Sequence, residues 1–367
     1  MGSEQAIKVL VCPLNWGIGH ATRCVPVIRS LVGRGFRVVL AADGRSMHFL
    51  MNEFPDLEFI RFSGFSPRYP YHGSMALKML ASVPAFVTSI FREHHQLKEI
   101  VSEHHIGLVI SDNRYGLWHR QVKSVIMIHQ VMIKTPGFLR WAEPLLYFIN
   151  RLMISRFHEC WIPDFPGVVN LSGDLSHKYP LPSNARFIGG LSRFEPGRLK
   201  PGNTSGALVA LLSGPEPQRT ILENILIKKL RAANIDCIVI SGKTEAVSQP
   251  KTVDGITIIP HLPTGELENM LRSAPLVICR PGYSSIMDLA AIGKKALFIP
   301  TPGQTEQEYL ASFHEKQGTF YYAEQRNFDL EESLHKASGY SGISSWPQES
   351  LLMQRIDSLA LLPEEHA

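Results

Sequence analysis

The stretch from residue 276 to residue 310 constrains the fold more than any other part of the chain, because short apolar runs alternate in it with polar turns. Residues 276–279 form an apolar run of the length of a buried parallel strand, and an Arg-Pro-Gly turn at 280–282 ends it. A helix with an apolar side is expected from Ser284 to Gly293, followed by a second apolar run at 296–300. The stretch therefore predicts a strand, a helix and a strand of one parallel sheet.

Polar residues gather at one edge of this unit. In open parallel sheets ligands bind beyond the carboxyl ends of the strands, where a helix N-terminus offers free N–H groups and a positive dipole end to an anion. Asp288 lies one turn into the helix, where a carboxylate can accept both hydroxyls of a ribose. The expected site comprises Arg280, Gly282, Tyr283, Ser284 and Ser285 near a diphosphate, with Asp288, Glu306 and Gln307 around them. The alternative is that Ser285 and Asp288 only form a capping box.

The ordered set Arg-Pro-Gly-Tyr-Ser-Ser-x-x-Asp at 280–288, followed by Glu306 and Gln307, resembles the donor-binding signature of GT-B glycosyltransferases. It is similar to the family that contains the lipid-linked peptidoglycan N-acetylglucosaminyltransferase, and more distantly to the UDP-glycosyltransferases of plants and animals. The resemblance implies that the Gly/Ser turn holds a diphosphate and that Asp288 binds ribose. It also implies that Glu306 and Gln307 bind hydroxyls of the donor sugar.

Composition sets the broad class. The 367 residues suggest about two domains, and 44% hydrophobic with 19% charged residues describes a soluble globular protein. No apolar run reaches the roughly 20 residues that span a bilayer, and the N-terminus lacks a signal-peptide pattern, so a cytoplasmic protein is expected. The odd number of cysteines, without CxxC spacing, indicates neither disulfides nor zinc. A net charge of +4 gives no case for nucleic acid.

The N-terminal half begins with an apolar run at 7–12, a glycine loop at 13–20 and a helix expected over 21–32. Gly17-x-Gly19 lacks the third glycine of a dinucleotide-binding fingerprint. The Gly-x-Gly-His sequence, with Pro26 further along, resembles instead the first loop of the same glycosyltransferases. In several of these the histidine at the position of His20 is the general base toward the acceptor. The alternative is that His20 only hydrogen-bonds the loop.

Asp112 is the candidate that orients His20. Residues 108–112 read as a strand that ends in this acid, and neighbouring strand ends in a parallel sheet bring their residues to a common edge. The resemblance to UDP-glycosyltransferases implies the same pairing. Residues 125–130 form another strand, and its end at His129 and Gln130 is similar to the His-Glu-Gln strand end of the peptidoglycan enzyme, with Gln130 in place of the acid.

Two further segments are assigned to the acceptor side. Tyr69, Tyr71 and His72 suit a loop that lines an acceptor site. Residues 138–157 are aromatic and basic, so this helix either rests on an anionic membrane or covers the sheet as a crossover helix. The adjacent histidine pairs at 94–95 and 104–105 point in different directions on a helix, so no metal site is expected.

A Pro/Gly/Ser-rich linker at 195–206 divides the chain into residues 1–195, residues 206–345 and a C-terminal helix within 346–367 that crosses back to the first domain. The second domain restarts with a strand at 207–212, a loop and a helix at 219–232. Two such halves, with the resemblance, give an α/β fold of GT-B type: two Rossmann-like parallel-sheet domains that face each other across a cleft.

The first loop of the second domain lies near the diphosphate in the peptidoglycan enzyme. Here Pro215 and Pro217 each remove an N–H donor, which leaves Ser213 and Gly214 as the candidates. In the family a loop after the third strand recognises the base. His261 and the backbone of Leu262 hold that position, where amide groups can read the edge of a uracil.

These observations predict a hexosyl- or N-acetylhexosaminyltransferase that moves a sugar from a UDP-sugar to an acceptor hydroxyl with inversion. No Asp-x-Asp motif is present, so neither a metal nor a cofactor is expected beside the donor. The resemblance implies a lipid-linked or glycan acceptor of the cell envelope and a place in the cytoplasm, including the inner face of the membrane. A sugar-nucleotide 2-epimerase and a non-catalytic sugar-nucleotide-binding protein stay open as alternatives.

Overall fold

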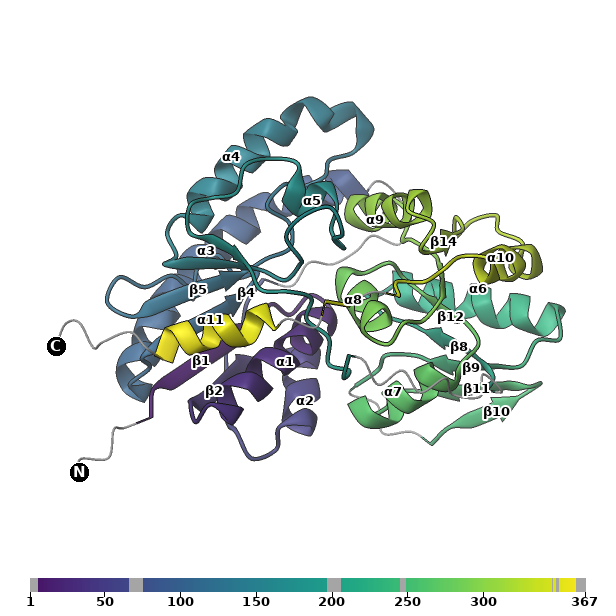
Figure 1. The fold of residues 1–367 in the computed structure, drawn as a ribbon, viewed down its shortest axis with the longest axis horizontal. Coiled ribbons are helices and arrows are strands. Elements are labelled where there is room, and N and C mark those ends of the chain that lie inside the picture. Colours follow the sequence, from purple (N-terminus) through teal and green to yellow (C-terminus); the bar gives the residue numbers. More distant parts are fainter. Residues whose placement is uncertain are drawn as a thin grey trace.

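The chain forms two α/β domains that lie side by side (Figure 1). The computed structural model describes residues 6–65, 75–196, 206–244, 249–344, 346–347 and 350–360. Within these residues each domain contains one seven-stranded sheet with helices packed on it. The segment with Tyr69, Tyr71 and His72 and most of the predicted linker, residues 197–205, lie outside the described ranges.

The N-terminal sheet is parallel throughout, with strand order β3-β2-β1-β4-β5-β6-β7. This order starts from a central β1 and runs outward in both directions, which places the topological switch point at the ends of β1 and β4. The elements are β1 Lys8–Pro13, α1 Gly19–Gly33, β2 Arg37–Ala42, α2 Gly44–Glu53, β3 Glu58–Arg61, α3 Met75–His104, β4 Leu108–Asp112, β5 Lys123–Met127, η1 Gly137–Ala142, α4 Glu143–Ile154, β6 Glu159–Ile162, α5 Asp174–His177 and β7 Ala185–Phe187.

The C-terminal sheet repeats this plan with strand order β10-β11-β9-β8-β12-β13-β14, in which only β10 pairs antiparallel. The elements are β8 Leu208–Leu211, α6 Gln218–Ala232, β9 Cys237–Ile240, β10 Lys251–Val253, β11 Ile256–Ile259, α7 Thr264–Ser273, β12 Val277–Cys279, α8 Tyr283–Ala291, β13 Ala296–Phe298, α9 Thr305–Lys316, β14 Tyr321–Tyr322 and α10 Leu330–Ser338. The two sheets confirm the predicted α/β class with two Rossmann-like domains.

The expected strand, helix and strand of residues 276–300 are present as β12, α8 and β13. Glycine 282 is the N-cap residue of α8, and no side chain caps this helix end. The capping box between Ser285 and Asp288 is therefore not formed, because the helix already begins at Tyr283. Pro281 ends the strand just before, and the free N–H groups of the first turn of α8 stay without a side-chain cap.

The last described helix, α11 Leu351–Ala360, returns to the N-terminal domain and lies against α1 (Figure 1, yellow and purple). Arg34 on α1 pairs with Asp357, and Arg355 donates through Nε to Glu159 Oε2 at 2.8 Å. Ile356 is fully buried. Apolar packing and these ion pairs hold α11 on the first domain after the chain has passed through the second.

Within the described part of the chain, none of the helices combines the length and the apolar character that crossing a bilayer requires. All five cysteines are free and buried. Their spacing had indicated no disulfide framework, and the side chains serve as small apolar groups of the two cores.

The contact between α11 and Glu159 predicts a pH-dependent contribution to stability. Burial raises the pKa of Glu159, but bonds from Arg355 and Trp161 and the charge of Lys123 outweigh it and lower the pKa from 4.5 to about 2. The ionised carboxylate therefore stabilises the fold above pH 4.5, and this contribution is lost as the pH falls from 4.5 toward about 2. In urea unfolding, Glu159→Gln should have a lower free energy of unfolding than the wild type at pH 7. This difference should become smaller as the pH falls below 4.5.

Glu332→Gln is the matched control, because Glu332 forms an exposed pair with Lys336 on α10. It should change stability little at any pH. If the free energy of unfolding that Glu159→Gln loses stays constant down to pH 2.5, the stabilising role of the ionised carboxylate is contradicted.

Candidate functional site

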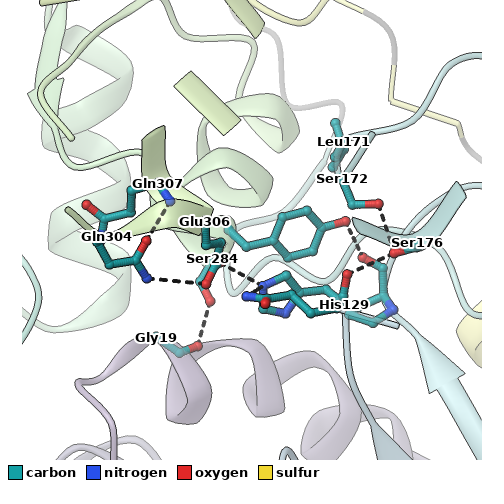
Figure 2. A network of polar contacts seen from close by, with 12 residues as sticks. Gly19, His129, Leu171, Ser172, Ser176, Ser284, Gln304, Glu306 and Gln307 are labelled. Carbon is teal, nitrogen blue, oxygen red and sulfur yellow. Dashed lines mark hydrogen bonds and ion pairs between the residues drawn. The ribbon is translucent and has the colours of Figure 1, made fainter. Parts of the chain in front are cut away.

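The carboxyl-end loops of the two sheets meet at the interface between the domains. Gly17 has a φ of +76°, and a Cβ added there would lie 3.9 Å from the Cα of Gly214 in the second domain. A Cβ on Gly19 would lie 3.2 Å from Ser284 Oγ, which donates to the carbonyl of Gly19 at 2.7 Å (Figure 2). Gly19 therefore permits a close approach of the first loop to the N-terminus of α8, which a side chain there would obstruct. At Gly17 a Cβ would make only an ordinary contact, and the positive φ is what disfavours another residue.

His20 and Asp112 lie together at this edge, as predicted. Asp112 ends β4, and its register opposite Pro13 of β1 puts it beside the start of α1. His20 Nδ1 lies 3.2 Å from Asp112 Oδ2. The proximity follows from parallel pairing of β1 with β4, whereas the catalytic roles of both residues stay predictions.

Arg23 is a third member of this group that the sequence interpretation did not include. Its Nε donates to both carboxylate oxygens of Asp112, at 2.9 and 2.8 Å, and its Nη2 donates to Asp112 as well. Its Nη2 also lies 3.0 Å from His20 Nδ1. Only 2% of Arg23 and none of Asp112 is exposed, so this is a fully buried ion pair.

The electrostatics of the group favour an ionised Asp112 and a neutral His20. Burial raises the pKa of Asp112, but the positive charge of Arg23 and the contact with His20 outweigh it and lower the pKa. Burial lowers the pKa of His20, Arg23 lowers it further, and Asp112 opposes both. An imidazole that stays neutral near neutral pH can act as a base.

His129 connects the first domain to the second. Its Nδ1 lies 2.8 Å from Arg23 Nη1, and its Nε2 lies 2.8 Å from Glu306 Oε1 at the start of α9 (Figure 2). The ring stacks on Tyr283 with a centroid separation of 4.4 Å and an interplanar angle of 2°. Tyr283 is buried and donates through its hydroxyl to the carbonyl of Pro163 at 2.8 Å. The ring of His129 is thus held by contacts from both domains.

Glu306 and Gln307 occupy the first turn of α9, but they differ in environment. Burial raises the pKa of Glu306, while His129, Gln304 and Arg23 outweigh burial and lower it, so the carboxylate is ionised. The side chain of Gln307 accepts from the backbone N–H of Thr301 at 2.8 Å. The backbone N–H of Gln307 donates to Gln304 Oε1. Gln307 therefore shapes the loop after β13, and Glu306 points to His129.

Asp288, which is expected to accept ribose hydroxyls, has partners within the protein. It accepts from Ser192 Oγ at 2.8 Å and from Arg193 Nε at 3.2 Å, both in the segment that follows β7 of the first domain. Burial raises the pKa of Asp288. Arg193 and Ser192 act in the opposite direction without cancelling the effect of burial, so the pKa lies above its ordinary value. A ribose at this carboxylate has to share it with these two residues, and its role in ribose binding stays a prediction.

Arg280 also differs from the expectation. The guanidinium is buried and donates to the carbonyl of Ile299, to the carbonyl of Gln218 and to Gln325 Oε1, all within the second domain. The side chain is directed into the domain because these acceptors lie behind β12. In this arrangement Arg280 supports the strand end, and its contact with a diphosphate stays a prediction.

The remaining predicted residues lie along the same interface. Gly214, with a φ of +103°, faces Gly17, next to Ser213 at the end of β8. Ser285 is half-buried in the first turn of α8 beside Gly282. His261 packs edge-on against Phe49 of α2 with a centroid separation of 6.1 Å, and Leu262 joins the core that continues through both domains. Base recognition by His261 and Leu262 stays a prediction.

Sequence reasoning missed the residues that link the domains. Arg23 lies three positions after His20, a spacing that places both on one helix face, so a local signal for it existed. Ser192 and Arg193 have no comparable signal, because their partner Asp288 lies about a hundred residues further along the chain. Among the described residues, no group of three histidine, cysteine or acidic side chains is arranged to hold a metal ion.

Comparisons with known proteins agree with this geometry. Residues 218–338 match the model of the glycosyltransferase family 28 C-terminal domain. The chain is 26% identical over 154 residues to the UDP-N-acetylglucosamine--N-acetylmuramyl-(pentapeptide) pyrophosphoryl-undecaprenol N-acetylglucosamine transferase of Caldanaerobacter subterraneus subsp. tengcongensis, a match that spans 39% of this chain and only 42% of that relative. The enzyme of the same name from Pasteurella multocida is 23% identical over 321 residues, with 84% of this chain and 81% of the relative covered.

The fold is also similar to solved structures. The crystal structure of MurG from Acinetobacter baumannii superposes with a TM-score of 0.56 at 12% identity, with 97% of this chain and 100% of that chain covered. At this identity the likeness concerns the fold, and it extends over both domains. The chain therefore has the GT-B fold, and its residues 218–338 resemble the C-terminal domain of glycosyltransferase family 28.

Proposed function

We propose that this protein transfers a hexosyl or N-acetylhexosaminyl group from a UDP-sugar to an acceptor hydroxyl, with inversion and without a metal ion. The observation that carries the proposal is the contact between Ser284 at the N-terminus of α8 and Gly19, the residue before His20. It sets an anion-binding helix end of the second domain directly against a neutral histidine of the first. A diphosphate and a general base are the two partners that such an arrangement suits.

In the proposed reaction Nε2 of His20 takes the proton of the acceptor hydroxyl. The acceptor oxygen forms a bond to the anomeric carbon from the face opposite the diphosphate, and the bond from that carbon to the β-phosphate oxygen breaks. UDP leaves with the electron pair, and the N–H groups and dipole of the first turn of α8 stabilise its charge. Binding of the diphosphate there requires Ser284 to exchange its bond with Gly19 for one with a phosphate oxygen.

The central test is acceptor-dependent release of UDP from UDP-N-acetylglucosamine and other UDP-sugars. Acceptors should include the N-acetylmuramyl pyrophosphoryl-undecaprenol substrate that the relatives' names state, and free glycosides. His20→Ala should lower kcat by roughly 10²–10⁴-fold, the usual value of general base catalysis, while UDP affinity stays near that of the wild type. The wild-type rate should persist in EDTA.

Each alternative predicts a different result. An epimerised UDP-sugar formed without acceptor would identify an epimerase, and tight UDP-sugar binding without turnover would identify a binding protein. Near-full turnover of His20→Ala at saturating acceptor would remove His20 as the base. Loss of activity in EDTA with rescue by magnesium or manganese would contradict the metal-independent reaction.

Asp288 is proposed to bind the ribose. Asp288→Ala should weaken UDP binding by about 10- to 100-fold, because the hydroxyls lose a charged acceptor that contributes about 1.5–3 kcal/mol. Ser192→Ala is the matched control, since it removes one neighbour of the carboxylate but keeps its charge, and it should change UDP affinity only slightly. Titration calorimetry measures both, with thermal unfolding as a check of the fold. Equal affinity in Asp288→Ala and the wild type would exclude Asp288 from the site.

The η1–α4 face is proposed to rest on an anionic membrane, which would bring the site near a lipid-linked acceptor at the inner face. We define this face as the exposed residues Phe138, Trp141, Leu145, Phe148 and Leu152. The last four follow helical spacing, and Arg140, Arg151 and Arg156 are exposed among them. The opposite side of α4 buries Asn150 and Ile154, so α4 also covers the sheet, as the crossover interpretation expected.

Trp141→Glu/Phe148→Glu should reduce binding to phosphatidylglycerol vesicles by at least about tenfold, because it removes buried apolar area and adds repulsion from anionic lipid. Co-sedimentation measures this, with phosphatidylcholine vesicles as a charge control. Val253→Glu alters an exposed apolar side chain on β10 of the other domain and should leave binding unchanged. Absence of wild-type binding to the anionic vesicles would overturn this part of the proposal.

A further inference from the structure

Arg23 makes contacts that extend beyond its ion pair with Asp112. It lies one turn after His20 on α1, is 2% exposed, and directs three nitrogen atoms at three different side chains. Nε bonds to both oxygens of Asp112, Nη1 lies 2.8 Å from His129 Nδ1, and Nη2 lies 3.0 Å from His20 Nδ1. One buried guanidinium thus contacts two histidines, His20 and His129, and the acid between them.

These contacts determine the tautomer of His129. A guanidinium is always protonated and can only donate, so His129 Nδ1 has to accept and carries no proton. The single proton of the neutral ring then lies on Nε2, which donates to Glu306 Oε1 at 2.8 Å. The parallel stack on Tyr283 keeps the ring in this plane. A doubly protonated His129 would direct Nδ1–H at Arg23, which no hydrogen bond can satisfy.

The guanidinium of Arg23 also weakens the electrostatic effect of Asp112 on His20. His20 Nδ1 is near a donor on Arg23 and near an acceptor on Asp112, and one protonation state satisfies only one of them. A base at Nε2 requires the proton on Nδ1, so Nδ1 donates to Asp112, and Arg23 Nη2 donates to Asp112 instead of to His20. Because Asp112 accepts from Arg23 through both oxygens, its charge is largely balanced before it meets the imidazole. Asp112 therefore orients His20 without drawing a second proton onto it.

We propose that Arg23 is a positioning residue that sets the protonation of both histidines: it holds His129 as the Nε2–H tautomer that donates to Glu306, and it keeps His20 uncharged beside Asp112. This inference rests on the proposed function for its consequence. The base of the first domain and the carboxylate proposed to bind the donor sugar are then oriented by one buried cation. The Glu306 carboxylate is aligned only while the domains are in contact, because its bond to His129 crosses the interface.

The first experiment reads the tautomer directly and needs no activity. Two-bond ¹H–¹⁵N correlation spectra of the full chain labelled with ¹⁵N-histidine separate the Nε2–H tautomer, the Nδ1–H tautomer and the imidazolium, and His129→Gln identifies the signals. The wild type at neutral pH should show His129 as the neutral Nε2–H form. An imidazolium or an Nδ1–H form in the wild type would overturn the inference, whatever reaction the protein performs.

Variants test the role of Arg23 itself. Arg23→Met/Asp112→Asn removes both buried charges together, since removal of one partner alone leaves an uncompensated buried charge. In this variant His129 should lose the single Nε2–H form. Arg219→Met/Glu223→Gln is the matched control, because it removes both charges of another buried ion pair, and no histidine contact is found for Arg219 among the described residues. It should leave the His129 signals unchanged, and unchanged signals in the double variant would contradict the inference.

The second readout is the pH profile of the transfer reaction. The charged and titratable groups that act on His20 are Arg23 on its own helix, Asp112 at the end of β4, and His129 after β5, and the thiol of Cys24 contacts Asp112. Arg23→Gln removes the cation that lowers the pKa of His20 and leaves Asp112 to raise it. The acidic limb of kcat/KM should therefore move upward by roughly one to two pH units. A lower kcat with an unchanged pH profile would indicate that Arg23 has only a structural role. It would overturn the inference that Arg23 keeps His20 uncharged.

Discussion

The buried ion pair between Arg23 and Asp112 is the interaction on which the interface of this protein depends. Two charges removed from water are stable only if they are paired and hydrogen-bonded, so the position of each is fixed by the other. Asp112 is placed by the register of β4 against β1, and Arg23 by the first turns of α1. His20 and His129 then take their positions around this pair. The ion pair thus fixes the positions of the donors and acceptors at this edge of the sheet.

The loop that follows β6 is held in one conformation and forms hydrogen bonds with the second domain. Asp164 is fully buried and accepts from the backbone N–H groups of Phe165, Leu171 and Ser172, which fixes the loop in one conformation. The second domain bonds to this loop through Tyr283 and through His314, whose Nε2 lies 3.1 Å from the carbonyl of Leu171. Burial lowers the pKa of His314 to about 4, so it stays neutral and can donate there. The domains are therefore joined through neutral hydrogen bonds as well as charges.

Close approach of the two domains leaves little room for a donor in the present arrangement. Ser284 bonds to Gly19, Asp288 to Ser192 and Arg193, and Glu306 to His129, so each of these three residues proposed for the donor has a protein partner. A nucleotide sugar offers the same kinds of groups: phosphate oxygens, ribose hydroxyls and sugar hydroxyls. Donor binding then amounts to an exchange of hydrogen bonds at an interface that is already polar, which keeps the cost of separating the domains low.

The sequence identified the elements and the residues at their ends, because these depend on local patterns. Apolar runs bounded by Pro, Gly and Ser located β12, α8 and β13, and a strand that ends in Asp112 placed this acid near the start of α1. The partners of these side chains were not predictable in the same way. Whether Asp288 meets a ribose or Arg193, and whether Arg280 points to a ligand or to the carbonyl of Ile299, depends on packing between segments far apart in the chain.

The sequence by itself therefore determined the α/β class, the two repeated halves and the edge at which polar residues collect, since strand and helix periodicity and the switch point follow from local chemistry and chain order. Only the tertiary structure decided that Arg23 lies between two histidines and that His129 reaches Glu306 across the interface. The physical reason is that a buried charge takes whichever partner the surrounding packing brings within hydrogen-bond distance. Those distances are set by the packing of α1 on the first sheet and by the contact between the two domains, and not by any spacing along the chain.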